Sequence, residues 1–228
     1  ASGDTFTFNG GLTESTTGKV TLAGSIDSSN DDITFGAITL AAATTLDTNA
    51  TDTNGDIIIG AVTGANNNLT LDTTASTGSA DNTFNGDINL GTGALDVTGD
   101  VVLGANVTVT ATPGSGSGII IRDAINADSA SSNDRTLTLT SCCFNTTRSP
   151  GSTIFALGNI GASEALAGLT VTQSNGATFS GSVNVSDTNS GTITLTDTID
   201  GANITFSGAV TADTFTTAAQ GYDIFLNG

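Results

Sequence analysis

Apolar and polar residues alternate in short stretches along most of this chain. An aliphatic residue alternates with threonine at 20–22, 69–71, 107–109, 137–139, 169–171 and 193–195. A period of two puts neighbouring side chains on opposite faces of a strand, so the aliphatic residues should face a core and the threonines solvent. The pattern predicts many short β-strands, each buried on one face.

A second pattern recurs between these strands and reads Phe-x-Gly-x-apolar-x-apolar. Its clearest copies are residues 84–90, 179–185 and 206–212, and looser copies begin at Phe8, Phe35, Ile59 and Leu103. From Phe8 to Leu103, successive copies start 19 to 27 residues apart. A period of this length is typical of repeat architectures, in which each unit buries its apolar face against its neighbours.

Together the two patterns predict an all-β chain that forms a β-solenoid, a parallel β-helix of about nine coils. At a strand spacing of about 4.8 Å, such a rod would be roughly 45 Å long. A β-sandwich is the alternative, because it would show the same alternation. We expect one domain over residues 1–228, with a loop at 113–118 and an irregular insertion at about 122–152.

Composition agrees with a fold built of strands and turns. The chain has no Met, only four Lys and Arg together, and 29 Gly, so residues that usually cover helix surfaces are scarce. The formal net charge is −18, which argues against nucleic acid as a partner, because phosphate binding needs clustered cations. No apolar run is long enough for a membrane helix, so membrane insertion is not expected.

The residues available argue against catalysis, and we expect the chain not to be an enzyme. It contains no His, which rules out Ser-His-Asp and Cys-His arrangements and removes the commonest nitrogen ligand of zinc. Its aspartates lie mainly in turn-like contexts, where they bond nearby backbone amides. A glycan-active β-helix enzyme built on an acidic pair is the enzymatic alternative.

Two other groups of residues could bind a ligand or form a cross-link. The oxygen-rich stretch at 47–56 offers calcium ligands at Asp47, Asn49, Asp52, Asn54 and Asp56. It lacks the Gly and closing Glu of an EF-hand, so we favour solvated turns over a Ca²⁺ site and expect no cofactor. Cys142 and Cys143 are the only thiols; they could form a disulfide, pair with another chain, or stay reduced.

The recurrent Thr-x-Thr stretches suggest a further alternative, because a flat threonine array can order water as an ice-binding surface does. They occur at 108–110, 138–140, 170–172 and 194–196. The ordinary explanation is that threonine is favoured at outward positions of strands. Their irregular spacing along the sequence argues against a flat, lattice-matched face.

The strand pattern continues to both ends, where apolar residues could join one copy to the next. An uncapped end strand is a template for further pairing, and head-to-tail addition of this kind propagates into an open filament. We therefore expect an assembly interface between residues 1–12 of one copy and 221–228 of another, formed by Phe6, Phe8, Leu12, Tyr222, Ile224, Phe225 and Leu226.

The stretches at 169–172, 178–183, 193–196 and 204–210 resemble bacterial β-strand-repeat surface proteins of the filamentous-haemagglutinin and autotransporter-passenger kind. The resemblance covers most of the chain apart from 113–152, and it implies a right-handed β-helix that is secreted or lies on the cell surface. Our hypothesis is an extracellular structural protein, a fibre subunit that binds copies of itself. The alternative is an adhesin segment that binds glycan or a host surface through 122–152.

Overall fold

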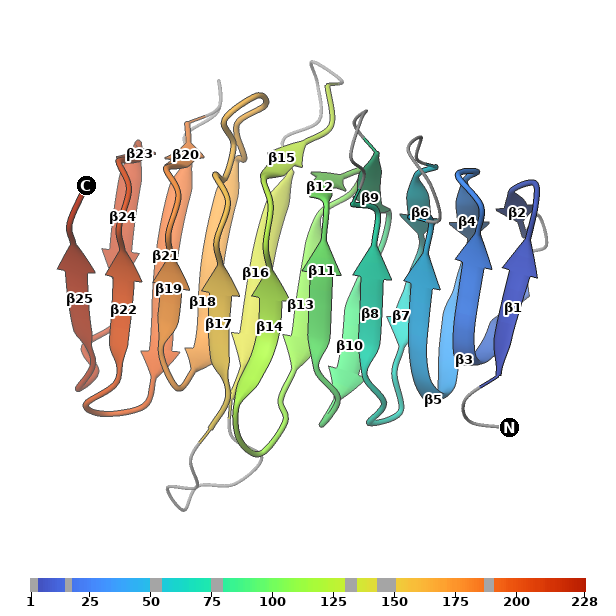
Figure 1. Cartoon of the computed structure of the whole chain (residues 1–228). Helices are drawn as coiled ribbons and strands as arrows, with labels where there is room; N and C mark the ends of the chain where they lie inside the picture. Colours follow the sequence, from blue (N-terminus) through green and yellow to red (C-terminus); the bar gives the residue numbers. More distant parts are fainter. Residues whose placement is uncertain are drawn as a thin grey trace.

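The computed structural model of the chain describes residues 4–14, 18–49, 55–74, 80–129, 135–142, 151–186 and 191–228. Within these ranges the secondary-structure elements are all β-strands, and the ladders between them are parallel. The described residues contain no helix of the length and hydropathy that crossing a membrane requires. Parallel stacking of successive strands confirms the β-solenoid and rules out the sandwich (Figure 1).

Each coil contributes strands to three faces, which we name front, top and back from their places in Figure 1. The front face stacks β1 (Thr5–Phe8), the second halves of β3 (Val20–Ser28) and β5 (Ile38–Asp47), β8 (Leu69–Asp72), β11 (Leu95–Thr98), β14 (Ser117–Ile121), β17 (Thr153–Ala156), β19 (Ala177–Phe179), β22 (Asn203–Phe206) and β25 (Asp223–Leu226).

The top face stacks β2 (Leu12–Thr13), β4 (Ile33–Phe35), β6 (Ile57–Ile59), β9 (Asp81–Phe84), β12 (Asp100–Leu103) and β15 (Ile125–Ala127). The bridging residue Ile160 then leads to β20 (Val183–Val185) and β23 (Val210–Ala212). The back face stacks the first halves of β3 and β5, β7 (Val62–Thr63), β10 (Ile88–Gly91), β13 (Val107–Ala111), β16 (Thr136–Ser141), β18 (Gly168–Ser174), β21 (Thr192–Thr198) and β24 (Thr214–Thr217).

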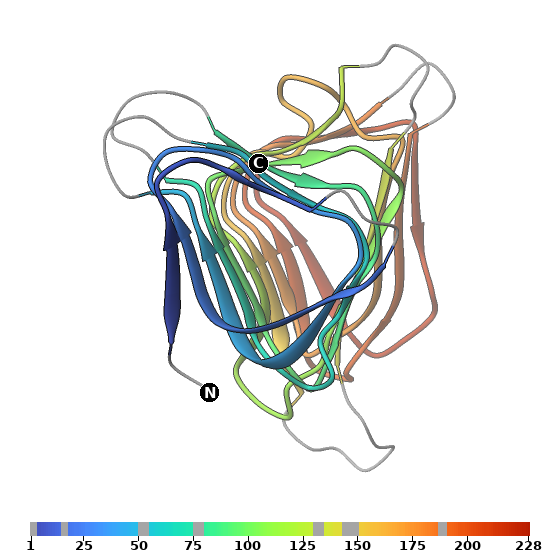
Figure 2. The ribbon, with the colours of Figure 1, turned by 90° about the vertical axis from the view of Figure 1, so that its right-hand side faces the viewer.

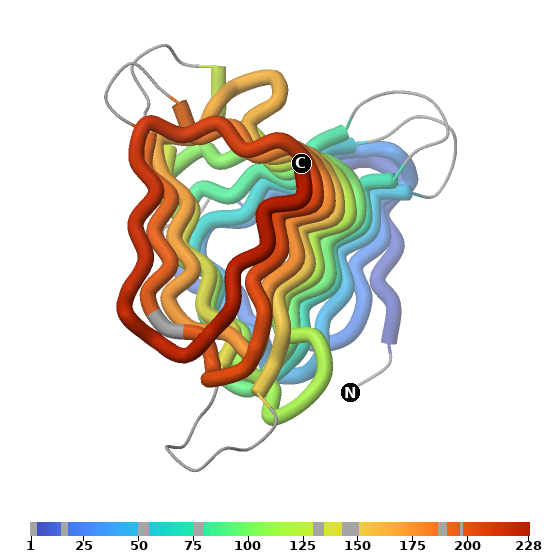
Figure 3. The backbone as a smooth tube through the Cα atoms, turned by 90° about the vertical axis from the view of Figure 1, so that its left-hand side faces the viewer, coloured from blue at the N-terminus to red at the C-terminus, as the bar shows by residue number. Residues whose placement is uncertain are grey.

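The coil is right-handed, as the views along its axis show (Figures 2 and 3). The chain ascends the front face, crosses the top and descends the back while it advances towards the C-terminus. In the described residues it returns to the front face nine times and to the other faces eight times. The solenoid therefore has between eight and nine turns, and the front face carries the outermost strand at both ends.

The core is a continuous column of aliphatic and aromatic side chains inside the coils. Along β8, β16 and β18 the aliphatic residues are buried and the threonines are partly exposed, as the alternation predicts. Phe84, Phe179 and Phe206 are the largest of the fully buried side chains. The rings of Phe179 and Phe206 stack with centroids 4.8 Å apart, so equivalent positions of successive coils pack on one another.

The glycine of the recurrent Phe-x-Gly unit lies where backbones of successive coils approach each other closely. A Cβ placed on Gly181 would come within 2.4 Å of the Gly158 oxygen, and one on Gly208 within 2.6 Å of Gly181. The unit does not stay on one face. Phe84 ends a top-face strand, whereas Phe179 and Phe206 end front-face strands. The repeat thus encodes a strand, a corner and the next strand.

Two expected irregular regions are more regular than the sequence suggested. The loop predicted at 113–118 ends earlier, because β14 begins at Ser117 and Gly118 is buried against the neighbouring coils. The insertion predicted at 122–152 contains β15 and β16, which pair in register with the coil before them. That stretch is therefore part of the stack, and the prediction of an irregular insertion is wrong for these strands.

Candidate functional site

In the described residues, four of the five large exposed apolar side chains lie at the two ends of the solenoid, and the fifth, Leu157, follows β17 in its middle. Phe6 on β1 is 57% exposed, and Phe215, Phe225 and Leu226 on β24 and β25 are 38%, 42% and 61% exposed. These strands belong to the first and last coils (Figure 1). Phe6, Phe215 and Leu226 lie at inward positions, which the neighbouring coils cover in the interior of the rod, whereas Phe225 lies in the outward column of Thr205.

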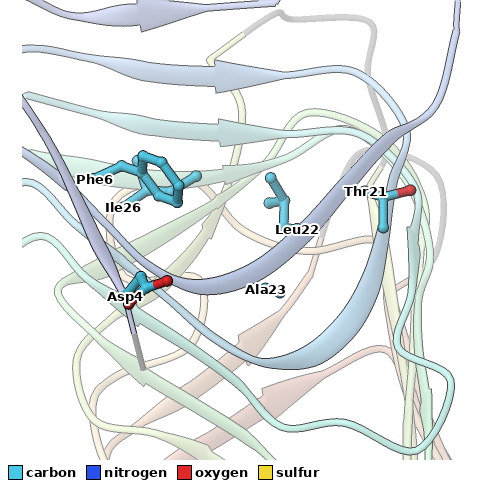
Figure 4. A pocket seen from close by; sticks show the side chains of 6 residues that line it. All are labelled: Asp4, Phe6, Thr21, Leu22, Ala23 and Ile26. Carbon is cyan, nitrogen blue, oxygen red and sulfur yellow. The ribbon is translucent and has the colours of Figure 1, made fainter. Parts of the chain in front are cut away.

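At the N-terminal end, β1 pairs with β3 along one edge, and Phe6 lies in register with Ile26. Phe8 and Leu12 pack partly buried against the core. A pocket of about 270 Å³ opens beside β1, lined by Asp4, Phe6, Thr21, Leu22, Ala23 and Ile26 (Figure 4). The apolar side chains of Phe6, Leu22 and Ile26 give this end a concave apolar surface.

At the C-terminal end, β25 pairs with β22 along one edge and ends the front-face column. Leu226 lies in register with the buried Phe206, and Ile224 packs partly buried against the core. On the back face, Phe215 lies in register with Ile193 and contacts the Phe206 ring edge-on at 5.9 Å. Leu226 and Phe215 therefore continue inward-facing columns that have no further coil above them in the described residues.

Most of the interface residues expected from the sequence lie at these ends, but Tyr222 does not contribute an exposed surface. Its ring is buried, and its hydroxyl donates a hydrogen bond to the Leu195 carbonyl oxygen at 3.0 Å. Phe215 was missed, although its place between Thr214 and Thr216 fits the alternation that marks inward positions. The end surface is therefore Phe6, Phe8 and Leu12 at one end and Phe215, Ile224, Phe225 and Leu226 at the other.

Carboxylates stack on the outer surface of the first coils. Asp27, Asp47 and Asp72 occupy consecutive rungs of the front face. Burial raises the pKa of Asp47, and the charges of Asp72 and Asp27 raise it further, against the lowering effect of a hydrogen bond from the Asn49 amide. Like charges one rung apart disfavour ionisation of the central group. Repulsion between these carboxylates therefore destabilises the folded state at neutral pH.

The expected calcium ligands are divided between two places. Asp47 and Asn49 belong to the front-face ladder, where the Asn49 amide donates to an Asp47 carboxylate oxygen at 2.8 Å. Asp56 lies at the start of the top face and accepts a hydrogen bond from the Asp81 amide at 3.0 Å; Asp52 and Asn54 lie outside the described residues. Within the described ranges, no three His, Cys, Asp or Glu side chains converge to hold a metal ion.

Burial also raises the pKa of Asp81, with further contributions from the Asp56 and Asp100 charges. Asp81 and Asp100 are partners in the top-face register. The carboxylates of Asp32 and Asp56 each accept a hydrogen bond from the backbone amide one coil further along. These aspartates thus stabilise the corner between coils, which is the structural use of aspartate in turns.

Of the alternatives for the thiols, the structure shows Cys142 in a disulfide. Cys142 is buried at the end of the back face, directly after β16. Cys143 is the one other cysteine in the chain and lies outside the described residues. A disulfide at this position is compatible with an oxidising environment.

Comparison of the chain with protein-family models, with curated proteins and with solved structures gives no match.

Proposed function

We propose that this protein is a structural β-solenoid element that assembles end to end into an extracellular fibre. The observation that carries the proposal is the pair of front-face edge strands, β1 and β25. Each is paired along one edge only in the described residues and carries exposed apolar side chains. Pairing of the two edges would bury those side chains and satisfy the backbone hydrogen bonds of both strands.

The register of the front face predicts how the two edges meet. Inward positions run from Phe6 through Ile26 and along the column to Phe206 and Leu226. If the column continues across the joint, Phe6 of one copy stacks on Leu226 of the next, and Thr5 lies opposite Phe225. Such a contact joins two different surfaces and does not close on itself, so it generates an open filament.

Charge would oppose this assembly at low ionic strength. Each copy carries a formal net charge of −18, and like-charged rods repel one another until salt screens them over a Debye length of about 10 Å at 0.1 M. Fibre formation should therefore be faster in salt than in dilute buffer. The disulfide at Cys142 supports an extracellular setting, where oxidised cysteines persist.

Cross-linking tests the joint directly. A variant with Thr5→Cys and Phe225→Cys places two outward thiols on facing strands across the joint, within the Cα separation of about 4.4–6.8 Å that a disulfide needs. Under oxidising conditions we expect a ladder of covalent oligomers on a non-reducing gel. The wild type, with Cys142 already in a disulfide, should not form this ladder.

The matched control is Thr5→Cys with Thr205→Cys. Thr205 lies in the same outward column as Phe225 but one coil further in, so its thiol would be two rungs, roughly 9.6 Å, from Thr5 of the next copy. That separation exceeds the range of a disulfide. Equal ladders from both variants, or none from the first, would contradict an in-register joint.

The adhesin alternative places glycan binding in 122–152. Deleting that stretch is an unsuitable test, because it would remove β15 and β16 from the stack. Exposed substitutions serve better: Arg122 forms a surface ion pair with Asp96 at 2.7 Å. Arg122→Ala should leave fibre formation unchanged under our proposal, whereas an adhesin that uses this residue should lose binding on a glycan array.

A further inference from the structure

Threonines form an in-register array on the back face of the solenoid. Thr108, Thr138, Thr170, Thr194 and Thr216 occupy one column on five consecutive coils, with no register shift at any of these positions. Thr136, Thr192 and Thr214 form a parallel column two residues before it, interrupted by Gly168. Thr110 and Thr140 are paired on the other side, but beyond a register shift that column continues with Gln173 and Asp197.

The irregular spacing of these threonines along the sequence does not carry over into space. The segments between them differ in length, but the extra residues lie in the turns, and the strands keep their register up to Leu139 and Val171, after which the β16–β18 ladder shifts by one residue. Rungs are spaced about 4.8 Å apart, and alternate residues along a strand about 6.6 Å apart. The back face thus presents hydroxyl and methyl groups on a two-dimensional grid.

The composition of this grid differs from that of the front face, although both consist of outward strand positions. The two back-face columns that run from β16 to β24 contain threonine and one glycine, whereas the outward column on the neighbouring front-face strands carries Ile120, Phe155, Thr178 and Thr205. The β-propensity of threonine would act equally on both faces. It does not explain why only the back face repeats threonine in one column on five consecutive coils.

From this grid we infer that the back face binds ice. Ice is an uncharged lattice of water molecules repeating every few ångströms in its planes, on the same scale as the rung and residue spacings. Each threonine hydroxyl can donate one hydrogen bond and accept two, and the β-branched side chain is stiff at χ1. A rigid grid therefore offers many weak contacts at once, with little loss of side-chain entropy on binding.

This site is independent of the proposed end-to-end joint, because it lies on the back-face strands between the ends. In a fibre, joined copies would present the grid repeatedly along one side, which would strengthen attachment to a growing ice surface. The two proposals can fail separately, since single rods still present the grid and fibres can form without it.

The experiment measures how much fluorescently labelled protein a slowly growing ice hemisphere takes up, using wild type and two variants. Thr170→Tyr places a bulky ring at the centre of the longest threonine column. Thr178→Tyr is the matched control, because Thr178 is an outward threonine in the middle of the front face. Circular dichroism and the unfolding midpoint of each variant check that the solenoid is intact.

We expect wild type and Thr178→Tyr to enter the ice, and Thr170→Tyr to fall to the level of serum albumin, which growing ice excludes. Exclusion of wild type from ice would overturn the inference. So would equal uptake of all three proteins, or an equal loss in both variants. If wild type is excluded from ice but sediments with insoluble chitin or cellulose, the grid binds a glycan and the inference is likewise wrong.

Discussion

Replacing Gly181 with alanine tests the packing of successive coils at the corner after a front-face strand. The added Cβ would lie 2.4 Å from the Gly158 oxygen, 2.6 Å from the Gly158 carbonyl carbon and 2.7 Å from the Asn159 nitrogen. An ordinary contact needs 3.4–4 Å, so the two backbones must separate by about 1 Å. All three atoms belong to the backbone, and no side-chain rotation relieves the clash.

Overpacking of this kind costs about 1–3 kcal/mol. For a domain of this size, each kcal/mol lowers the melting temperature by roughly 2–4 °C. Gly181→Ala should therefore melt about 2–12 °C below wild type. The matched control is Gly114→Ala, in the loop before β14, where a Cβ meets nothing within 4 Å. That change should be neutral or stabilise the fold by up to about 1 kcal/mol, because it restricts the unfolded chain.

Urea and thermal unfolding followed by far-ultraviolet circular dichroism give both values, and a second substitution at the same corner, Gly208→Ala, should behave like Gly181→Ala. If Gly181→Ala is as stable as Gly114→Ala, the backbones at Gly181 and Gly158 are farther apart than in the structure. The explanation of the Phe-x-Gly repeat as a close backbone contact would then be refuted.

Four further substitutions, one of them a control, probe the core, the acidic ladder and a buried polar corner. Phe206→Ala should lower the free energy of unfolding by about 3–5 kcal/mol, since it removes a buried ring stacked on a neighbour; Phe225→Ala, on an exposed ring, should cost within about 0.5 kcal/mol. Both are read from urea titrations. Asp47→Asn should stabilise the fold at pH 7 by about 0.2–1 kcal/mol, because it removes a like charge from the ladder. With burial the main cause, the pKa of Asp47 is raised above its ordinary value of 3.8, so the folded state binds the proton more tightly. The stability contributed by this group therefore rises as the pH falls from above the raised pKa towards 3.8. Asp47→Asn should lack this rise. Melting temperatures of wild type and variant that fall in parallel over this pH range would contradict the reasoning. Asn82→Ala should lower the free energy of unfolding by about 1–3 kcal/mol in a thermal melt. The Asn82 side-chain amide donates hydrogen bonds to the Thr73 hydroxyl at 3.0 Å and to the Thr98 carbonyl oxygen at 3.1 Å. A neutral result would show that water replaces these hydrogen bonds in the variant.

The alternation of threonine with aliphatic residues predicts which side chains face the core, and the recurrence of the Phe-x-Gly unit favours a solenoid over a sandwich. Leu137 and Leu139 are buried and Thr138 is partly exposed, as a period of two requires. The approximate number of coils also agrees with the repeat length. These features depend on local pattern, which the chain repeats in every coil.

The register between coils could not be predicted, because it depends on how turns of different lengths close. The Phe-x-Gly unit illustrates this limit, since Phe84 lies on the top face and Phe179 on the front. The stretch with Cys142, Cys143 and Pro150 led to the expectation of an insertion at 122–152, although the alternation at 137–139 marks β16, and the short run of β15 was not recognised. Tyr222 was expected at the surface, but its hydroxyl reaches the Leu195 carbonyl inside the last coils.

The threonine grid could not be predicted for the same reason, because it depends on the register between coils. Its members were recognised as Thr-x-Thr stretches, but their irregular separation in sequence argued against a flat face. Only the pairing of β13, β16, β18, β21 and β24 shows that the separations are absorbed by turns.

Negative-stain electron microscopy of the purified protein, at rising concentration and salt, tests the proposed assembly most directly. Ten front-face strands at about 4.8 Å predict thin unbranched fibres with an axial repeat of about 48 Å. The fibres should disappear in a variant that carries Phe6→Asp and Leu226→Asp. Isolated short rods at every concentration, or fibres unaffected by those two substitutions, would contradict end-to-end assembly through β1 and β25.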